Sequence, residues 1–373
     1  MARLGKDRRI TDKAVRAIFM KSWITLRREL FYPMVVEVHD SHVEKDFAAM
    51  IGTVPQIQEV SDDVNDPAVS DFVDYRVDWK NRLYKAVISL SRSFLDFDQT
   101  GQSRTLLHSM AARLANWPER LLINAIVNGT DATVMPSFED TATPFFSAAH
   151  DLGGDVSGTG LSNIVTGSTT EAFINATAPH TTAQEILADF REAKARMHGF
   201  TDDRGEPFHL DNIPPESLFI LCSPSLEIPM RLAFTAEQIN GTTNRFANAV
   251  GRIVASNYLG TAFTGAPVNS SWYVMHVRER VRPFKYSRFR RIRDSEIEDF
   301  GIREDLEKAS GFNNISMNVA REMSSVELST NLGNFGANAE ADVIRHDRFL
   351  IAARWRGAIF PGEWRNAVKV SNT

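Results

Sequence analysis

The stretch QSRTLLHSMAARLANWPERLLINAIV, residues 102–127, is the longest run of this chain with a helical pattern. Its apolar residues recur at steps of three and four, which places an apolar stripe on one side of a helix. The stripe consists of Leu106, Leu107, Met110, Ala111, Leu114, Leu121, Leu122, Ala125 and Ile126. Pro118 interrupts the run, because proline lacks the N–H that would bond four residues back. Asn116 and Glu119 have the N-x-x-E spacing of a capping box, so we expect a second helix to start here and to end at Gly129.

The composition is that of a folded globular protein. Of the 373 residues, 43% are hydrophobic and 24% are charged, which excludes a largely disordered chain and allows one elaborate domain or two to three simple ones. A formal net charge of -5 means that contact with nucleic acid would have to come from local patches. Cys222 is the only cysteine, which excludes an internal disulfide and fits a reducing cytoplasm. The chain lacks a signal peptide and a run of about 18 apolar residues, so we expect no membrane partner.

Two segments before the long helix have apolar faces but little chain nearby to cover them. Residues 14–30 form an amphipathic basic pattern, which favours a helix that docks onto protein over one that lies on a membrane. Residues 61–75 are acidic and poor in large apolar side chains, and residues 82–97 alternate in the manner of a strand. We interpret residues 62–96 as an extended arm of two strands. Because an isolated hairpin is marginal in water, such an arm needs another surface to lie on.

The second half of the chain alternates irregularly between helical and strand patterns. Helices are expected at residues 181–198 and 225–234, and buried strands at residues 217–224 and 271–277. Residues 277–293 hold eight Lys or Arg residues against one Glu, and their alternation predicts a long strand with a basic face. That face either binds phosphates or faces solvent or a neighbouring subunit. This order of elements indicates an α+β fold with one or two sheets.

The search for catalytic, cofactor-binding and metal-binding residues is mostly negative. Ser147 and His150 are a candidate nucleophile and base, but no G-x-S-x-G surrounds the serine and no acid partner stands out. Asn163 stands where a G-x-G-x-x-G motif needs its third glycine, which argues against a dinucleotide site. Three histidines lie too far apart for a zinc motif: His180, His198 and His209. We therefore expect no enzyme, no cofactor and no metal.

Six segments in order resemble the major head subunit of Mu-like tailed phages, a branch of the HK97-fold major capsid proteins. They are FAAMIGTVPQIQEV (47–60), AARLANWPERLLINAIVNG (111–129), PFFSAAH (144–150), FTDDRGEPF (200–208), LFILCSPSLE (218–227), and WYVMHV (272–277) followed by RPFKY (282–286). Residues 294–342 depart from the resemblance as a long polar stretch. The ending RWRGAIFPGEW (354–364) resembles the family's glycine-rich close only loosely.

The resemblance implies the HK97-like division of the chain. It assigns residues 1–60 to an N-terminal arm, 61–98 to an E-loop, and 99–180 to a peripheral domain built on the long spine helix. It assigns residues 181–277 to an axial domain, and 278–373 to peripheral strands and a C-terminal segment. The implied function is a major capsid protein of the virion, assembled in the host bacterial cytoplasm into hexamers and pentamers of an icosahedral shell around double-stranded DNA. The implied partners are further copies of the chain, and scaffold, portal and decoration proteins.

Two rival functions and one question of charge remain open. A phage connector or tail component would assemble into rings or tubes instead of closed shells, and a hydrolase would use Ser147 and His150.

The acidic arm carries Asp62, Asp63, Asp66, Asp71 and Asp74, and the basic segment carries Arg278, Arg280, Arg282, Lys285, Arg288, Arg290, Arg291 and Arg293. We hypothesise that the two segments meet between subunits. The alternative places the basic face on packaged DNA.

Overall fold

The fold is taken from a computed structural model of the chain. The structure describes residues 21–22, 25, 30–51, 74–91, 101–138, 143–150, 160–167, 179–209, 212–239, 241–259, 271–277, 281–289, 326–329 and 348–371. Most of the helix expected at residues 14–30, and most of the acidic segment 61–75, lie outside the described residues. So does most of the polar stretch 294–342.

The long helical stretch forms two consecutive helices, α4 (Gln102–Ala115) and α5 (Trp117–Val127), as the interruption predicts. Pro118 lies in the first turn of α5, where a missing N–H costs nothing. The expected capping box is wrong, because Asn116 keeps helical backbone angles and its side chain makes no capping hydrogen bond. Gly129 follows the end of α5, and a Cβ there would lie 2.6 Å from the Phe146 ring. Glycine is needed at this position for close packing.

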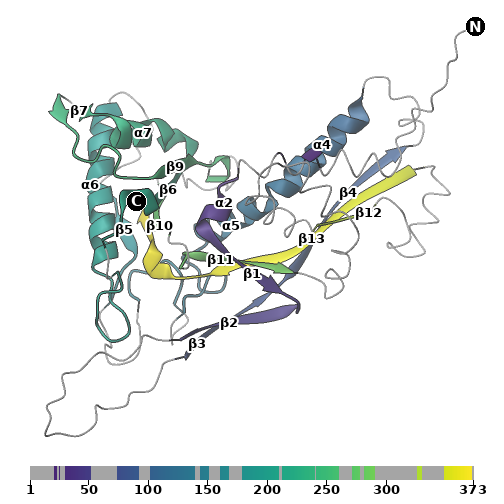
Figure 1. Cartoon of the computed structure of the whole chain (residues 1–373), viewed down its shortest axis with the longest axis horizontal. Helices are drawn as coiled ribbons and strands as arrows, with labels where there is room; N and C mark the ends of the chain where they lie inside the picture. Colours follow the sequence, from purple (N-terminus) through teal and green to yellow (C-terminus); the bar gives the residue numbers. More distant parts are fainter. Residues whose placement is uncertain are drawn as a thin grey trace, which may run out of the picture.

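A five-stranded sheet lies alongside these two helices. Its strands are β1 (Val36–Ser41), β4 (Arg82–Ser91), β11 (Phe284–Phe289), β12 (Val326–Ser329) and β13 (Arg348–Pro361). The order is β1-β11-β13-β12, with β4 paired to β13, and only β1 and β11 run parallel. Figure 1 shows β13 and β4 as a long ribbon beside α4 and α5. Tyr84 of β4 contacts Trp117 of α5, with ring centroids 5.1 Å apart.

A second five-stranded sheet holds most of the apolar core. Its order is β5 (Ile164–Thr166), β14 (Ala367–Ser371), β10 (Trp272–His276), β6 (Leu218–Cys222) and β9 (Arg252–Ala255). The apolar strands β6 and β10 are buried along their whole length. Helices α6 (Pro179–His198) and α7 (Glu227–Thr235) pack beside this sheet and contact each other. The helices and strands expected in this region are confirmed. The strands β5 and β14, which come from other parts of the chain, complete the sheet.

The arm differs from the expected hairpin of residues 62–96. Its two strands are β2 (Lys45–Ile51) and β3 (Asp74–Lys80), which pair antiparallel, whereas β4 pairs with β13 of the main sheet. The alternation in residues 82–97 indicated a strand correctly, but strand pairing is non-local and no pattern within the segment names the partner. In Figure 1, β2 and β3 lie on the side of the main sheet away from α4 and α5.

The remaining elements are short. They are α2 (Tyr32–Val35), β7 (Gln238–Ile239), β8 (Thr242–Thr243), and the 3₁₀ turns η2 (Pro215–Ser217), η3 (Pro224–Leu226), η4 (Asn257–Leu259) and η7 (Trp364–Asn366). Within the described part of the chain, every helix is too short or too polar to cross a membrane.

Candidate assembly site

One face of the arm is anchored to the body by apolar side chains. Along β3, Val77 and Trp79 are buried, whereas the residues between and beside them are exposed. The Trp79 ring stacks on Phe360 of β13 with centroids 3.7 Å apart, and His39 of β1 packs edge-on against Trp79 at 5.7 Å. Val77 clusters with Phe138 from the loop after α5. The base of the arm is thus held against the main sheet.

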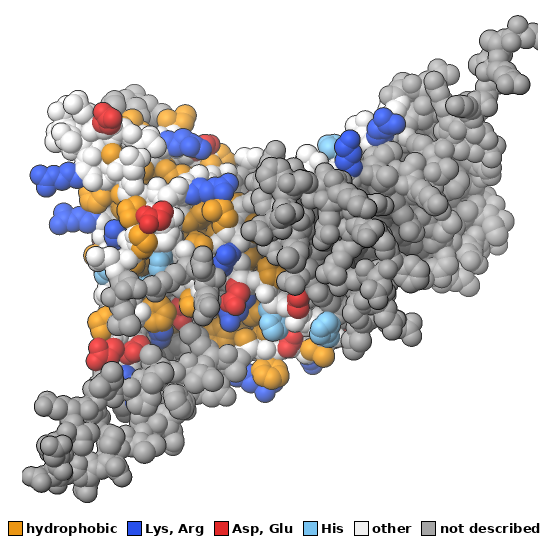
Figure 2. Space-filling model, in the orientation of Figure 1, with side chains coloured by type: hydrophobic (Ala, Val, Ile, Leu, Met, Phe, Trp, Pro, Cys, Tyr) orange, Lys and Arg blue, Asp and Glu red, His pale blue; other side chains and the backbone are white. Residues whose placement is uncertain are grey.

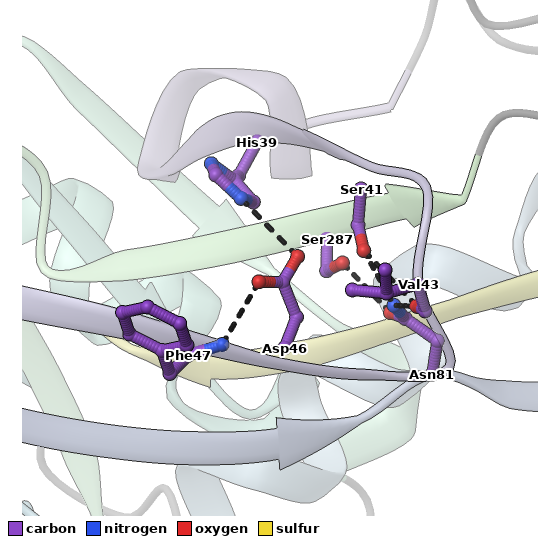
Figure 3. Close-up of polar contacts among 7 residues, drawn as sticks. All are labelled: His39, Ser41, Val43, Asp46, Phe47, Asn81 and Ser287. Carbon is purple, nitrogen blue, oxygen red and sulfur yellow. Dashed lines mark hydrogen bonds and ion pairs between the residues drawn. The ribbon is translucent and has the colours of Figure 1, made fainter. Parts of the chain in front are cut away.

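A second set of contacts joins the arm to the body through polar side chains (Figure 3). Asn81 lies between β3 and β4 and is 2% exposed. Its amide nitrogen donates to the Ser41 hydroxyl at 2.9 Å and to the Val43 carbonyl at 2.8 Å. Its amide oxygen accepts from the Ser287 hydroxyl of β11 at 2.7 Å. We call these four residues the arm root.

A histidine and a carboxylate lie close together beside the arm root. The His39 Nε2 atom of β1 lies 3.5 Å from the Asp46 carboxylate of β2, and the same carboxylate accepts from the Phe47 N–H at 2.9 Å. Burial alone would raise the pKa of Asp46, but hydrogen bonds from Ser41 and Phe47, together with His39, hold it below its ordinary value. Figure 2 shows acidic, basic and histidine side chains side by side where β1 turns into β2.

The other face of the arm is open to solvent and carries a large apolar side chain. Phe47 is 51% exposed, and the Arg76 guanidinium lies over its ring, 4.2 Å from the centroid. Arg76 also pairs with Asp78 at 2.8 Å. Exposed Phe and Arg side chains are typical of the centre of a protein interface, where both contribute strongly to binding.

The chain between residues 31 and 36 is held by four side chains from other parts of the chain. The Glu119 carboxylate of α5 accepts from the Phe31 N–H at 3.3 Å, which is the bond it makes in place of the expected capping box. Arg282 donates to the carbonyls of Pro33 and Val36, and so completes the last turn of α2. Stacking of Phe31 on Phe219 and an edge contact of Tyr32 with Tyr286 add apolar contact. We call this arrangement the collar.

The described part of the basic segment 277–293 contains the strand β11 (Phe284–Phe289), which lies between β1 and β13. Arg288 is 4% exposed and makes an ion pair with Asp40 of β1 at 2.5 Å. Lys285 lies 4.0 Å from Glu37 of the same strand. These two cations and Arg282 are therefore engaged within the subunit, because the parallel partner strand β1 supplies carboxylates and carbonyls in register.

The hypothesis that the acidic arm and the basic strand meet between subunits stays a prediction, and Arg282, Lys285 and Arg288 also have partners within their own subunit. The other basic residues of the segment lie outside the described residues, as do the aspartates at 62, 63, 66 and 71. For those residues the contact stays a hypothesis.

Ser147 and His150 do not have the geometry of a nucleophile and its base. The Ser147 hydroxyl donates to the Ala149 carbonyl at 3.0 Å. The His150 ring is stacked on Trp364 at 3.7 Å, and its Nε2 atom lies 3.1 Å from the Asn163 amide oxygen. The same oxygen accepts from the Ser147 N–H at 2.9 Å. Asn163 thus organises the loop of residues 143–150, a role that neither its sequence position nor the failed glycine motif indicated.

Two buried histidines lie close together elsewhere in the described part of the chain. Among the described residues, no group of three or more His, Cys, Asp or Glu side chains is arranged to hold a metal ion. His209 and His276 pack edge to face with ring centroids 5.2 Å apart. The Asn366 amide oxygen lies 3.4 Å from His276 Nδ1, and the Arg365 carbonyl lies 3.4 Å from His209 Nε2.

Asn81, Glu119 and Arg282 make the hydrogen bonds of the arm root and the collar, and sequence reasoning missed them or assigned them to other roles. A buried asparagine between two strands is a detectable signal, since Asn is depleted in strands and favoured in turns. The partners of Glu119 and Arg282 lie 88 and 246 or more residues away, so no local pattern could identify them.

The comparisons with known proteins agree with this geometry. Two solved phage shells have the same fold over most of their length. The mature capsid of bacteriophage PhiM1 matches with a TM-score of 0.52 and 11% identity, over 92% of this chain and 87% of the other. The capsid of cyanophage P-SCSP1u matches with a TM-score of 0.52 and 10% identity, over 92% and 88%. The fold is therefore that of the HK97-type phage capsid proteins, as the sequence predicted.

A family model matches part of the sequence. Residues 10–179, which include the arm and the spine helices, match the family of the Mu-like prophage major head subunit gpT. No curated protein sequence matches the chain. The match covers slightly less than half of the chain, so the chain is similar to the Mu-like major head subunits over this segment.

Proposed function

We propose that the chain assembles with copies of itself into the hexamers and pentamers of an icosahedral virion shell around double-stranded DNA. Assembly would take place in the host bacterial cytoplasm, and scaffold, portal and decoration proteins would be further partners. The division into N-terminal arm, E-loop, peripheral domain and axial domain belongs to the same proposal. So does a structural role without catalysis, which the hydrogen bonds of Ser147 and His150 support.

The single observation that carries this proposal is the arm, whose inner face is anchored and whose outer face is open. A two-stranded ribbon is marginal in water by itself. Trp79 and Val77 stabilise its inner face against the body, but Phe47 on the outer face remains half-exposed. A second copy of the chain that covers Phe47 and Arg76 would bury this apolar area and exclude water from the cation–π contact.

Phe47 variants test this proposal. We expect Phe47→Ala to leave the subunit folded, because its side chain is half-exposed, and to reduce shell yield at least tenfold at a fixed protein concentration. Phe47→Tyr is the matched control, because it retains the ring and should assemble like the wild type. Sedimentation velocity measures the assembled fraction, and electron micrographs show its form. Closed shells support the proposal, whereas rings or tubes from the wild type would support a connector or tail component. Equal shell yields from Phe47→Ala and wild type would contradict the role of the arm.

A further inference from the structure

The arm root does more than attach the arm to the body. We propose that Asn81 is a positioning residue that fixes the direction in which the arm β2–β3 leaves the main sheet. This inference rests on the proposed function, because the direction of the arm matters when its outer face has to meet a second copy of the chain.

Asn81 lies where the two segments that connect the arm to the body come together. The chain enters the arm through residues 42–44, between β1 and β2, and leaves it at residue 81, between β3 and β4. The Asn81 N–H donates to the Glu44 carbonyl at 2.8 Å. Its side chain holds Val43 and Ser41 on the entering segment. One residue therefore ties the two segments to each other.

The third side-chain bond of Asn81 ties these segments to the body. Its amide oxygen accepts from Ser287, which is fully buried in β11 between β1 and β13. The amide has two N–H donors and one oxygen, and all of these groups are used. Figure 3 shows the side chains of Asn81, Ser41 and Ser287 converging between the ribbons of arm and sheet.

Hydrogen bonds and apolar contacts differ in how strongly they restrict orientation. Burial of Trp79 against Phe360 holds the arm base near the body, but apolar burial is non-directional. The bonds of Asn81 weaken when their angles change, and they are shielded from competing water. The arm strands have seven residues each, about 23 Å at the usual rise of a strand. A rotation of about 20° at the root would move the arm tip by about 8 Å, which is more than the width of a side-chain contact.

The direction of the arm is measurable as a distance between two spin labels on the full chain. The labels are placed by Asp78→Cys on the outer face of β3 and by Arg104→Cys on α4, both of which are exposed. The native Cys222 is buried and its pKa is raised to about 12 by burial, so it does not compete for the label at neutral pH. In dilute, unassembled subunits we expect one narrow distance distribution.

Asn81→Ala should at least double the width of this distance distribution or shift its mean. The matched control is Asn244→Ala, because Asn244 is also buried and also makes three side-chain hydrogen bonds, to Ala233, Ala236 and Phe246. It lies far from the arm in the chain and should lose stability without changing the distance. Ser287→Ala removes only the link to β11 and should broaden the distribution to a smaller extent, which keeps the test available if Asn81→Ala does not fold.

The outcomes separate this inference from the proposed function. A distribution as narrow in Asn81→Ala and Ser287→Ala as in Asn244→Ala would overturn the positioning role. A broadened distribution together with fewer or misshapen shells supports both. A broadened distribution together with normal shells confirms that Asn81 positions the arm, and overturns the dependence of assembly on the arm.

Discussion

At the scale of single residues, the Glu119 carboxyl of α5 is the group of the collar whose protonation changes with pH. Burial is the largest influence on this carboxyl and raises its pKa from 4.5 to about 7, while the Phe31 N–H and Arg252 act in the opposite direction. Between pH 4.5 and 7 the folded chain therefore binds a proton that the unfolded chain releases. The stabilisation from this group is complete below pH 4.5 and is lost as the pH rises through 7.

Glu119→Gln should remove this pH dependence, because glutamine keeps an oxygen that accepts from Phe31 but has no proton to lose. We expect the free energy of unfolding of the wild type to fall, relative to the variant, by about 2 kcal/mol between pH 4.5 and 8, after a discount for partial solvent exposure. Urea unfolding of unassembled subunits at both pH values gives this difference. Glu192→Gln, at an exposed glutamate of α6, is the control and should follow the wild type. Parallel curves for all three proteins would show that Glu119 has an ordinary pKa.

At the scale of elements, the pairing of β1 with β11 explains why a basic segment can form the interior of a sheet. The two strands run parallel, so Glu37 lies opposite Lys285 and Asp40 opposite Arg288. Arg288 donates from both Nε and an Nη atom to Asp40 at 2.7 and 2.5 Å. The exposures of the partners differ, with 5% of the Arg288 side chain and 39% of the Asp40 side chain accessible.

This difference in exposure predicts which residue of the ion pair costs more folding stability when it is replaced. Asp40→Ala should destabilise the chain by about 3 kcal/mol, because it leaves a buried guanidinium without its carboxylate. Arg288→Met should cost only about 1 kcal/mol, since the exposed Asp40 can be hydrated and methionine fills much of the volume. Asp40→Asn is the control, because it keeps an acceptor and should lie between the two. Urea unfolding midpoints give the ranking, and the reverse order would show that Arg288 reaches solvent.

At the scale of the whole molecule, the proposed function assigns the arm and the N-terminal segment to contacts with other copies of the chain. The buried core of the described chain begins at Phe31, and the collar bonds to residues 31–36 come from Glu119 and Arg282. Removal of residues 2–20 should therefore leave the unfolding temperature within about 2 °C of the wild type, because no described contact is lost.

The same truncation should assemble poorly, since the amphipathic pattern at residues 14–30 favours docking onto protein. Shell yield by sedimentation velocity measures this effect. A chain in which residues 2–20 are scrambled keeps their charge but loses the amphipathic order, and it should assemble as poorly as the truncation. Normal shells from either chain would show that the segment has no docking role.

Local patterns in the sequence determined much of the fold. The steps of three and four in residues 102–127 predicted the spine helices, and Pro118 predicted their interruption, because both signals depend only on neighbouring residues. The six ordered segments predicted the HK97-type class and a resemblance to the Mu-like head subunits. The solved structures confirm the fold, and the family model matches residues 10–179. The assembly partners and the site residues stay predictions.

Only the tertiary structure decided which segments meet. Residues 82–91 had a clear strand pattern, yet their partner is β13, more than 250 residues later in the sequence. The sequence predicted that the basic residues of β11 bind phosphates or face solvent or a neighbouring subunit. In the structure, β1 runs beside β11 and Asp40 pairs with Arg288. Asn81 and Glu119 took their roles from residues brought together by folding. The physical reason is that helix periodicity is a property of adjacent residues, whereas strand pairing, ion pairing and burial depend on contacts between residues distant in the chain.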